Sequence, residues 1–268
     1  MIRLSSCIEM MFGELPFVQR IEAAKTTGFQ AWEMWNWANR DLPALEEAMG
    51  KAGLPAAACC VGSRDPLVVS GMKHANMLDA RNARMFAEMV EETITAVDCL
   101  RIKTLIATTG NTLPDVPREQ QQEAIVSCLS AAAPILAKHG CVIVLEPLNI
   151  LVNHAGYYLS TSGQGFEILN QVGSPHVKLL YDVYHQQITE GNLIDAIRAN
   201  IRAIGHFHIA DVPGRFEPGT GEINYGNVFT AISASGYDGY VGCEYAPSNG
   251  KSTAESARLV LELANRQS

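Results

Sequence analysis

The amino-acid sequence predicts a single-domain α/β protein with the architecture of a closed (β/α)8 TIM barrel. Eight short apolar runs alternate with eight longer segments of helical periodicity. The units recur about every thirty residues, as expected for a barrel built from β–α repeats. No Gly-rich phosphate-binding loop follows the first apolar run, which disfavours a doubly wound dinucleotide-binding sheet.

The expected strands are continuously apolar rather than alternating. Val, Ile, Leu and Ala dominate them, a composition typical of parallel strands that are buried on both faces. We expect strands at residues 4–8, 31–35, 56–61, 104–107, 142–146, 178–182, 203–209 and 240–244.

Helices are expected around these strands, because apolar residues recur there at i, i+3, i+4 and i+7. We place them at residues 15–27, 42–52, 80–100, 119–139, 162–171, 192–200, 225–235 and 254–265. Gly follows several of these segments, in TTGF, KAGLP, KHGC, QVGSP and ASGYDGY, where a left-handed residue commonly ends a helix.

Length and composition indicate one domain over residues 1–268. Hydrophobic residues make up 47% of the 268 positions, and α/β barrels of this size are usually single domains. Four long irregular segments, at residues 62–77, 108–118, 147–161 and 210–224, each follow an expected strand. They should therefore meet at the C-terminal face, where barrels of this kind carry their active sites.

Composition also limits the partners and the location. The formal net charge is −8 and no run of Lys or Arg occurs, so we expect no nucleic-acid partner. No apolar run approaches the ~20 residues that span a bilayer, and no signal-peptide pattern is present, so we expect no membrane partner. Seven cysteines without a C-x-x-C pair indicate free thiols and a reducing, cytoplasmic location. A homo-oligomer is compatible with these features, which leave the subunit number open.

Four expected strands end in a side chain that can bind a metal. These residues are Glu146, Asp182, His208 and Glu244, each one β–α unit after the last. A single polar strand end is more often a satisfied cap, but three carboxylates at one rim would repel one another unless a cation neutralised them. Three carboxylates and one imidazole suit Mn²⁺, Mg²⁺ or Co²⁺ better than a structural zinc. We therefore predict one divalent metal ion and a small-molecule substrate.

Three other polar residues near this rim keep two interpretations each, and a fourth is expected to support a ligand. His185 could bond a substrate hydroxyl or support a ligand, and Arg215 could fork onto a substrate or remain a solvated loop charge. Glu33 could contact substrate or make only a structural hydrogen bond. His206 shares a strand face with His208 and is expected one layer deeper, as a supporting residue.

The sequence also contains tryptophans and histidines outside this group. One of the tryptophans in WEMWNW could wall the pocket while others pack under the helices. The remaining histidines stand in loops or at helix ends, and we take them as surface residues: His74, His139, His154 and His176.

The sequence resembles a known family along nearly its whole length. The segments LEPLN, YDVYHQQ, HFHIADVPGRFEPGTGEINY and GCEY are similar to the hydroxypyruvate isomerase branch of the xylose-isomerase-like barrels. The N-terminal MMFGELPFVQRIEAAKTTGFQAWEMW is similar to that branch too. The D-tagatose 3-epimerases are its relatives, and ADVPGRFEPGTGEINY is the most specific segment.

The resemblance implies roles for the matching residues. The metal ligands of the family match Glu146, Asp182, His208 and Glu244. Glu146 and Glu244 would double as the acid/base pair, and His185 and Arg215 match substrate-binding positions. The position of His208 can be Gln in bacterial hydroxypyruvate isomerases, whereas His is typical of the epimerases. This departure leaves the substrate open.

These residue types indicate proton transfer through an enediolate. A C–H group next to a carbonyl is too weakly acidic for an unaided carboxylate, but a divalent ion stabilises the enediolate while two carboxylates relay protons. Return of the proton to the neighbouring carbon gives an isomerase, which the resemblance identifies with interconversion of hydroxypyruvate and tartronate semialdehyde. Return to the same carbon gives the alternative, a ketose 3-epimerase acting on a free sugar.

Two other classes remain as rivals. An endonuclease of the same barrel type, acting at abasic DNA, would need three metal ions, more histidines at the rim and a basic groove. A sugar-binding barrel without activity would have lost one of the two rim glutamates. The sequence has net charge −8 and keeps both glutamates, so we predict an enzyme acting on a small molecule.

Overall fold

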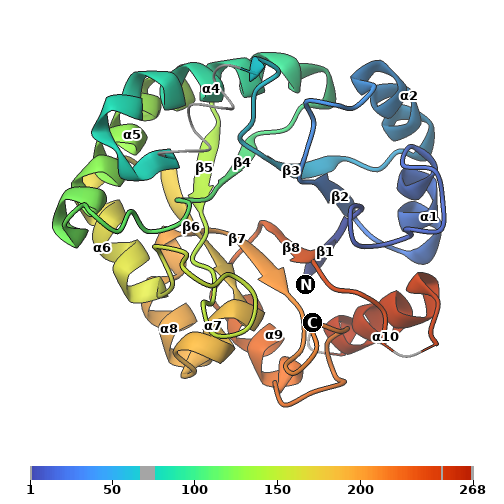
Figure 1. Cartoon of the computed structure of the whole chain (residues 1–268). Helices are drawn as coiled ribbons and strands as arrows, with labels where there is room; N and C mark the ends of the chain where they lie inside the picture. The colour runs from blue at the N-terminus through green and yellow to red at the C-terminus, as the bar shows by residue number, and fades with distance from the viewer. Residues whose placement is uncertain (1, 67–75, 249, 267–268) are drawn as a thin grey trace.

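Eight parallel strands close into a barrel in chain order (Figure 1). The structure is a computed structural model that describes residues 2–66, 76–248 and 250–266. The strands are β1 (Arg3–Cys7), β2 (Ala31–Met34), β3 (Ala56–Cys60), β4 (Thr104–Ala107), β5 (Val142–Leu145), β6 (Val177–Asp182), β7 (Ile204–Ile209) and β8 (Tyr240–Cys243). The predicted barrel is therefore confirmed, with each strand within two residues of its expected ends.

Helices surround the barrel, and α10 packs against both α1 and α9 to complete the ring (Figure 1). The α-helices are α1 (Gln19–Thr27), α2 (Leu42–Ala52), α4 (Ala83–Ala96), α5 (Arg118–His139), α6 (Ser162–Val172), α7 (Val183–Thr189), α8 (Leu193–Asn200), α9 (Tyr225–Ala234) and α10 (Thr253–Asn265). Short 3₁₀ turns lie at Asn76–Leu78, Ala80–Asn82, Asp98–Leu100 and Ile201–Ala203. None of the helices in the described ranges is long and apolar enough to cross a membrane.

Most helix ends agree with the sequence patterns. The helix expected at 15–27 begins only at Gln19, as α1, and two further differences follow. Gly53 and Gly140 end α2 and α5 with φ of 59° and 61°, the left-handed conformation predicted for them. The expected helix at 80–100 is instead α4 flanked by two 3₁₀ turns. Helix α7 was not predicted, because its seven residues directly follow β6 and are too few to show a helical period.

The inside of the barrel is divided between an apolar and a polar half. Strands β3 to β6 contribute an apolar cluster separate from the main core: Ala58, Ile106, Val144 and Leu180. Strands β2 and β7 instead contribute Glu33, His206 and His208, which contact one another and are almost fully buried. Buried polar groups must satisfy one another, so these contacts tie β2 to β7 across the barrel.

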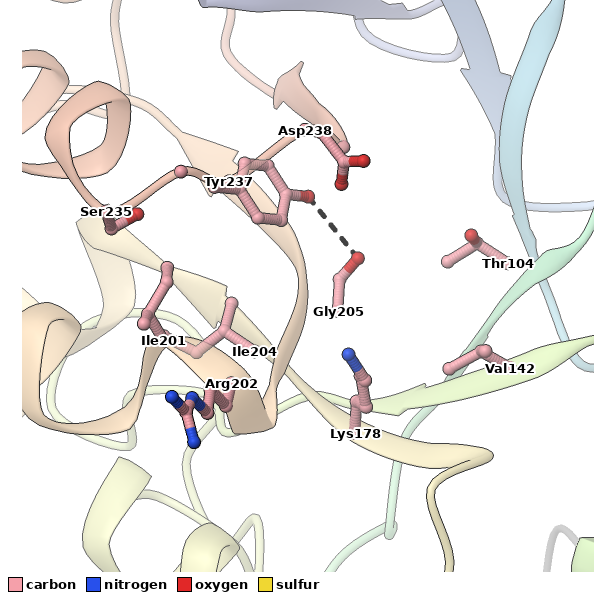
Figure 2. Close-up of a pocket in the computed structure, with 12 residues that line it drawn as sticks. Thr104, Val142, Lys178, Ile201, Arg202, Ile204, Gly205, Ser235, Tyr237 and Asp238 are labelled. Carbon is pink, nitrogen blue, oxygen red and sulfur yellow. Dashed lines mark hydrogen bonds between the residues drawn. The ribbon is translucent and has the colours of Figure 1, made fainter.

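A hollow of about 290 Å³ opens at the N-terminal ends of the strands (Figure 2). Tyr237 lies beside it, and its hydroxyl lies within hydrogen-bond distance of two carbonyl oxygens, 2.9 Å from Tyr240 and 3.3 Å from Gly205. The residues that line this hollow include two exposed charged residues, Arg202 and Asp238. The metal-competent strand ends lie at the opposite rim, so this hollow is separate from the candidate active site.

Gly205 in β7 offers a test of the barrel packing. A Cβ at this position would lie 2.7 Å from Val144 Cγ1 and 3.0 Å from Lys178 Cβ, closer than packed carbon atoms approach. Each atom is held close to the backbone of its own strand, Val144 in β5 and Lys178 in β6. We therefore expect Gly205→Ala to lower the free energy of unfolding by about 1–3 kcal/mol in urea titrations.

Gly50 provides the matched control. It lies within α2, and a Cβ added there would meet no described atom within 4 Å. Gly50→Ala should raise the free energy of unfolding by up to about 1 kcal/mol, because Ala is the better helix former. Equal effects of the two substitutions would contradict this account of β7.

Candidate active site

Four strands bring their polar ends together at the C-terminal rim. Asp182 and His208 lie in β6 and β7 and are paired in register, while Glu146 and Glu244 directly follow β5 and β8. All four side chains belong to residues that are at most 6% exposed. Each offers one ligand atom, and these atoms lie within 4.8 Å of one another. The four predicted metal ligands therefore form a compact group that could hold a metal ion.

The imidazole of His208 stands at the centre of this group. Its Nδ1 lies 3.3 Å from Glu146 Oε1 and 3.6 Å from Glu244 Oε2, while its Nε2 lies 3.0 Å from Glu33 Oε1. Burial alone would lower the pKa of His208, but Glu244, Glu33 and Glu146 raise it well above its usual value. The carboxylates around Nδ1 thus stabilise a positive charge at this position, either a proton or a metal ion.

Glu146 experiences the same crowding. Burial is the largest influence and raises the pKa of its carboxyl group, and the charges of Glu244 and Asp182 raise it further. The hydrogen bond and charge of His208 act in the opposite direction but do not cancel these effects. A divalent cation would relieve the repulsion, and the set of three carboxylates and one imidazole is suited to such an ion.

His185 is placed by the turn from β6 into α7. The side chain of Asp182 accepts the backbone N–H of His185 at 3.1 Å and so caps the helix. His185 Nδ1 accepts the backbone N–H of Asn149 at 3.1 Å, which assigns the ring proton to Nε2. Burial lowers the pKa of His185 to about 4, so the ring is neutral near pH 7. Among the described residues its Nε2 has no hydrogen-bond partner and lies 3.6 Å from Asp182 Oδ2.

Arg215 reaches the site from the loop after β7. Its backbone is left-handed, with φ of 57°, and its guanidinium pairs with Glu244 Oε2 and lies 5.5 Å from the ring centre of Tyr184. Within the described part of the chain, Arg215 Nε is buried without a partner. The guanidinium therefore has a donor left over for a substrate oxygen, as the fork geometry of Arg allows.

The loop that carries Arg215 is folded around a buried carboxylate. Asp211 accepts four backbone N–H groups at 2.8 to 3.2 Å, from Val212, Gly219, Gly221 and Ile223. A Cβ at Gly221 would overlap the Val212 carbonyl oxygen, so only Gly fits there. This loop belongs to the segment 210–224 that the sequence placed at the active-site face.

A pocket of about 230 Å³ lies over the ligand group. Its lining is Trp35, Cys60, Ile106, Thr108, Glu146, Leu148, His154, His208, Arg215 and Glu244. Trp35 is the tryptophan that walls it, and its indole N–H donates to Glu244 Oε1 at 2.7 Å. The apolar wall and the convergent polar groups are typical of a small-molecule site.

His154 lines this pocket, although the sequence placed it on the surface. Its ring centre lies 5.2 Å from that of His185, and burial together with Arg215 lowers its pKa. Sequence reasoning missed it because nothing periodic marks its loop. The turn is closed by Asn149, whose side-chain oxygen accepts the backbone N–H groups of Val152 and Asn153. His74, another of the histidines taken as surface residues, lies outside the described residues.

Glu33, like Asp182 and His185, is a predicted site residue that the pocket lining does not include. Its two carboxylate oxygens lie 3.0 Å from His208 Nε2 and 3.1 Å from His206 Nε2. Of its two interpretations, the geometry favours the structural hydrogen bond over contact with substrate. His206 lies behind His208, in the supporting place expected for it.

Comparison with known proteins agrees with this geometry. A family model described as a xylose isomerase-like TIM barrel matches residues 21–263. The chain belongs to this family. It is 32% identical to hydroxypyruvate isomerase of Escherichia coli, over 92% of this chain and 94% of the relative. It is 30% identical to 2-oxo-tetronate isomerase of Cupriavidus necator, over 94% and 95%. The expected resemblance is thus confirmed, and these relatives support an isomerase as the enzyme class.

Solved structures share the same barrel. The structure of a protein named AP endonuclease, family 2, from Brucella melitensis has a TM-score of 0.86 and 28% identity, covering 98% of this chain and 99% of that one. D-allulose 3-epimerase from Methylomonas sp. has a TM-score of 0.78 and 18% identity, covering 100% and 97%. At this lower identity the epimerase shows the fold alone.

Asp211 offers a test of how the site is supported. Asp211→Asn replaces one acceptor oxygen with an NH₂ group that would face backbone N–H donors. We expect the free energy of unfolding to fall by about 2–4 kcal/mol in denaturant titrations, because buried donors lose their partner. The exposed Asp115 serves as a control, and Asp115→Asn should change stability by less than about 0.5 kcal/mol. An unchanged Asp211→Asn variant would show that the loop does not depend on this carboxylate.

Proposed function

We propose that this protein is a divalent-metal-dependent isomerase that interconverts hydroxypyruvate and tartronate semialdehyde. The observation that carries the proposal is the group of four ligand atoms within 4.8 Å of one another at the floor of a small pocket. The metal would be held by Glu146, Asp182, His208 and Glu244. A bound Mn²⁺, Mg²⁺ or Co²⁺ supplies Lewis acidity, which makes a C–H group next to a carbonyl acidic enough for a carboxylate to deprotonate.

The two glutamates would move the protons. Glu146 and Glu244 follow β5 and β8, which are not neighbours in the barrel, and both line the pocket. Glu244 is oriented by Trp35 and by the guanidinium of Arg215. Burial favours the protonated form of Glu146, as suits a group that must accept a proton and return it. One carboxylate would take the proton from the first carbon and the pair would deliver it to the second.

Two donors would orient the substrate. The neutral His185 presents an N–H group beside Asp182, and Arg215 has a buried Nε without a described partner. Arg is suited to a carboxylate through two parallel hydrogen bonds. The names of the two isomerase relatives both refer to 2-oxo acids, which carry such a carboxylate. These features support a small oxo acid as the substrate.

A ketose 3-epimerase is the second candidate. It would use the same residues, and His208 is the choice typical of epimerases in the resembling family. The epimerase structures support this candidate at the level of fold only. An endonuclease activity, which the name of the Brucella melitensis protein suggests for that protein, fits this chain less well, because its net charge is −8 and it has no basic run. We propose a small-molecule substrate and no nucleic-acid partner.

Removal of one ligand charge tests the metal site. Asp182→Asn keeps an oxygen that can cap α7 but removes a charge from the ligand group. We expect its affinity for Mn²⁺ to fall by about 100-fold or more, since even supporting residues contribute 10–100-fold. Calorimetric titration and elemental analysis measure this. Asp238→Asn, at the exposed opposite end of the barrel, should bind metal like the parent. Full metal occupancy in Asp182→Asn would refute the assignment.

Isotope exchange tests the proton-transfer pair. In D₂O the metal-loaded parent should convert hydroxypyruvate and place deuterium at the carbon next to the carbonyl. Glu146→Gln and Glu244→Gln keep size and a ligating oxygen but remove the base, so each should lose about 10²–10⁴-fold in rate. Metal content must be measured beside each rate. A metal-loaded variant that exchanges hydrogen at the parental rate would exclude that glutamate from proton transfer.

The same assay distinguishes the two candidate functions. A panel of ketoses is incubated beside hydroxypyruvate, and exchange is followed by NMR. Rapid exchange on a ketose with none on hydroxypyruvate would replace the proposed function by the epimerase.

A further inference from the structure

His154 lies on the wall of the pocket over the ligand group. It lines this pocket together with Arg215, whereas the neighbouring His185 does not, although the two imidazole ring centres are 5.2 Å apart. In the described part of the chain, neither ring nitrogen of His154 has a hydrogen-bond partner. An imidazole can donate through one nitrogen and accept through the other, so this ring is able to bind a polar group in the pocket.

Hydrogen bonds to α7 and within the turn fix the backbone around His154. The N–H of His154 donates to the Asn149 carbonyl at 3.1 Å, and the N–H of Asn149 donates to His185 Nδ1 at 3.1 Å. Asn153 Oδ1 accepts from Asn149 Nδ2 at 3.1 Å and from the Tyr184 hydroxyl at 2.8 Å. The turn is therefore fastened to α7 on both sides of its exposed tip. A side chain carried on such a fixed turn loses little conformational freedom when it binds a ligand.

Few hydrophilic residues of the lining are left for the substrate. The ligand group supplies three of them, and Arg215 pairs with one of these three, Glu244. The other hydrophilic residues of the lining are His154 and Thr108. Thr108 is exposed, so its hydroxyl can bind water, whereas His154 is partly buried. A substrate group that the metal does not bind would therefore meet Arg215 and His154.

A carboxylate is the substrate group that most needs two such partners. Glu146, Asp182 and Glu244 gather at the floor of the site, so a further anion is repelled unless donors surround it. Arg215 provides a positive charge but shares it with Glu244. Burial and the charge of Arg215 lower the pKa of His154, so the ring is neutral near pH 7 and can donate an N–H beside the guanidinium without repelling it.

We propose that His154 is a substrate-binding residue that, together with Arg215, binds the carboxylate of a 2-oxo acid and so selects acids over neutral hydroxyketones. The inference rests on the proposed function and deepens it, because it names the side chain that recognises the acid group. The family resemblance matched His185 and Arg215 to substrate-binding positions and assigned no role to His154.

A matched pair of substrates isolates the acid group. Dihydroxyacetone has a CH₂OH group where hydroxypyruvate has its carboxylate, and it keeps the carbonyl and hydroxyl groups that a metal ion would bind. We expect the metal-loaded parent to prefer hydroxypyruvate in kcat/KM. Dihydroxyacetone is also measured as a competitive inhibitor, which gives its affinity even without turnover. A parent that binds and converts both compounds equally well would overturn the inference without any variant.

His154→Phe removes the two nitrogens and keeps an aromatic ring beside His185 and Tyr157. We expect KM for hydroxypyruvate to rise by about 10–100-fold, because a hydrogen bond to a charged group is lost. The value of kcat and the affinity for dihydroxyacetone should change by less than about 3-fold, since a contact made equally in ground state and transition state affects binding alone. His154→Gln restores an N–H donor and should recover part of the affinity for hydroxypyruvate.

Leu151→Ala is the matched control in the same turn. Leu151 is 71% exposed and does not line the pocket, so its substitution should leave both affinities at the parental values. A parental KM for hydroxypyruvate in His154→Phe would overturn the inference and leave the proposed function in place. Equal weakening of both compounds would also overturn it, because the ring would then support the pocket as a whole. A parent that converts no 2-oxo acid would overturn the proposed function together with this inference.

Discussion

The concentration of negative charge at one end of the barrel is the constraint on which the rest of the site depends. Glu33, Glu146, Asp182 and Glu244 are each at most 6% exposed and lie around one imidazole. Carboxylates this deeply buried repel one another and lose hydration. Arg215, which pairs with Glu244, compensates part of the charge. The negative charge that is not compensated raises the pKa of His208. The proposed metal ion would neutralise this charge.

The barrel can accommodate this charge because some of its strands direct apolar side chains inward and others direct polar ones inward. The apolar cluster of β3 to β6 fills one half of the interior, so the opposite half can be given to polar side chains without loss of a packed core. Parallel pairing carries Asp182 and His208 to the same level, and β5 and β8 end where their glutamates can face them. Short distances within the site thus follow from strand register rather than from the loops, which among the described residues contribute Arg215, His154 and part of the pocket wall.

The sequence predicted what parallel strands determine and missed what side-chain packing determines. Continuous apolar runs predicted the strands of the barrel. Four of these runs end in a polar residue, and the four ends must meet at one edge because the strands are parallel. Helix α7 gave no periodic signal. Asp182, which caps it, was predicted instead as the polar end of a strand. His154 enters the pocket through a turn closed by Asn149, and Glu33 meets His206 across 173 residues of sequence. Local patterns carry no information on contacts of that kind, so two interpretations of Glu33 stayed open until the fold was known.

The two glutamates of the proposed mechanism are not equivalent, and their surroundings follow from their strands. Glu244 stands where β8 meets the walls formed by Trp35 and Arg215, and both donate hydrogen bonds to it. Glu146 is hydrogen-bonded to His208, and burial favours its protonated form. A reaction that moves a proton between adjacent carbons needs one carboxylate held in a fixed direction and another that changes protonation state readily. The asymmetry of these contacts supplies that difference within one fold, and His208 is the group on which both carboxylates converge.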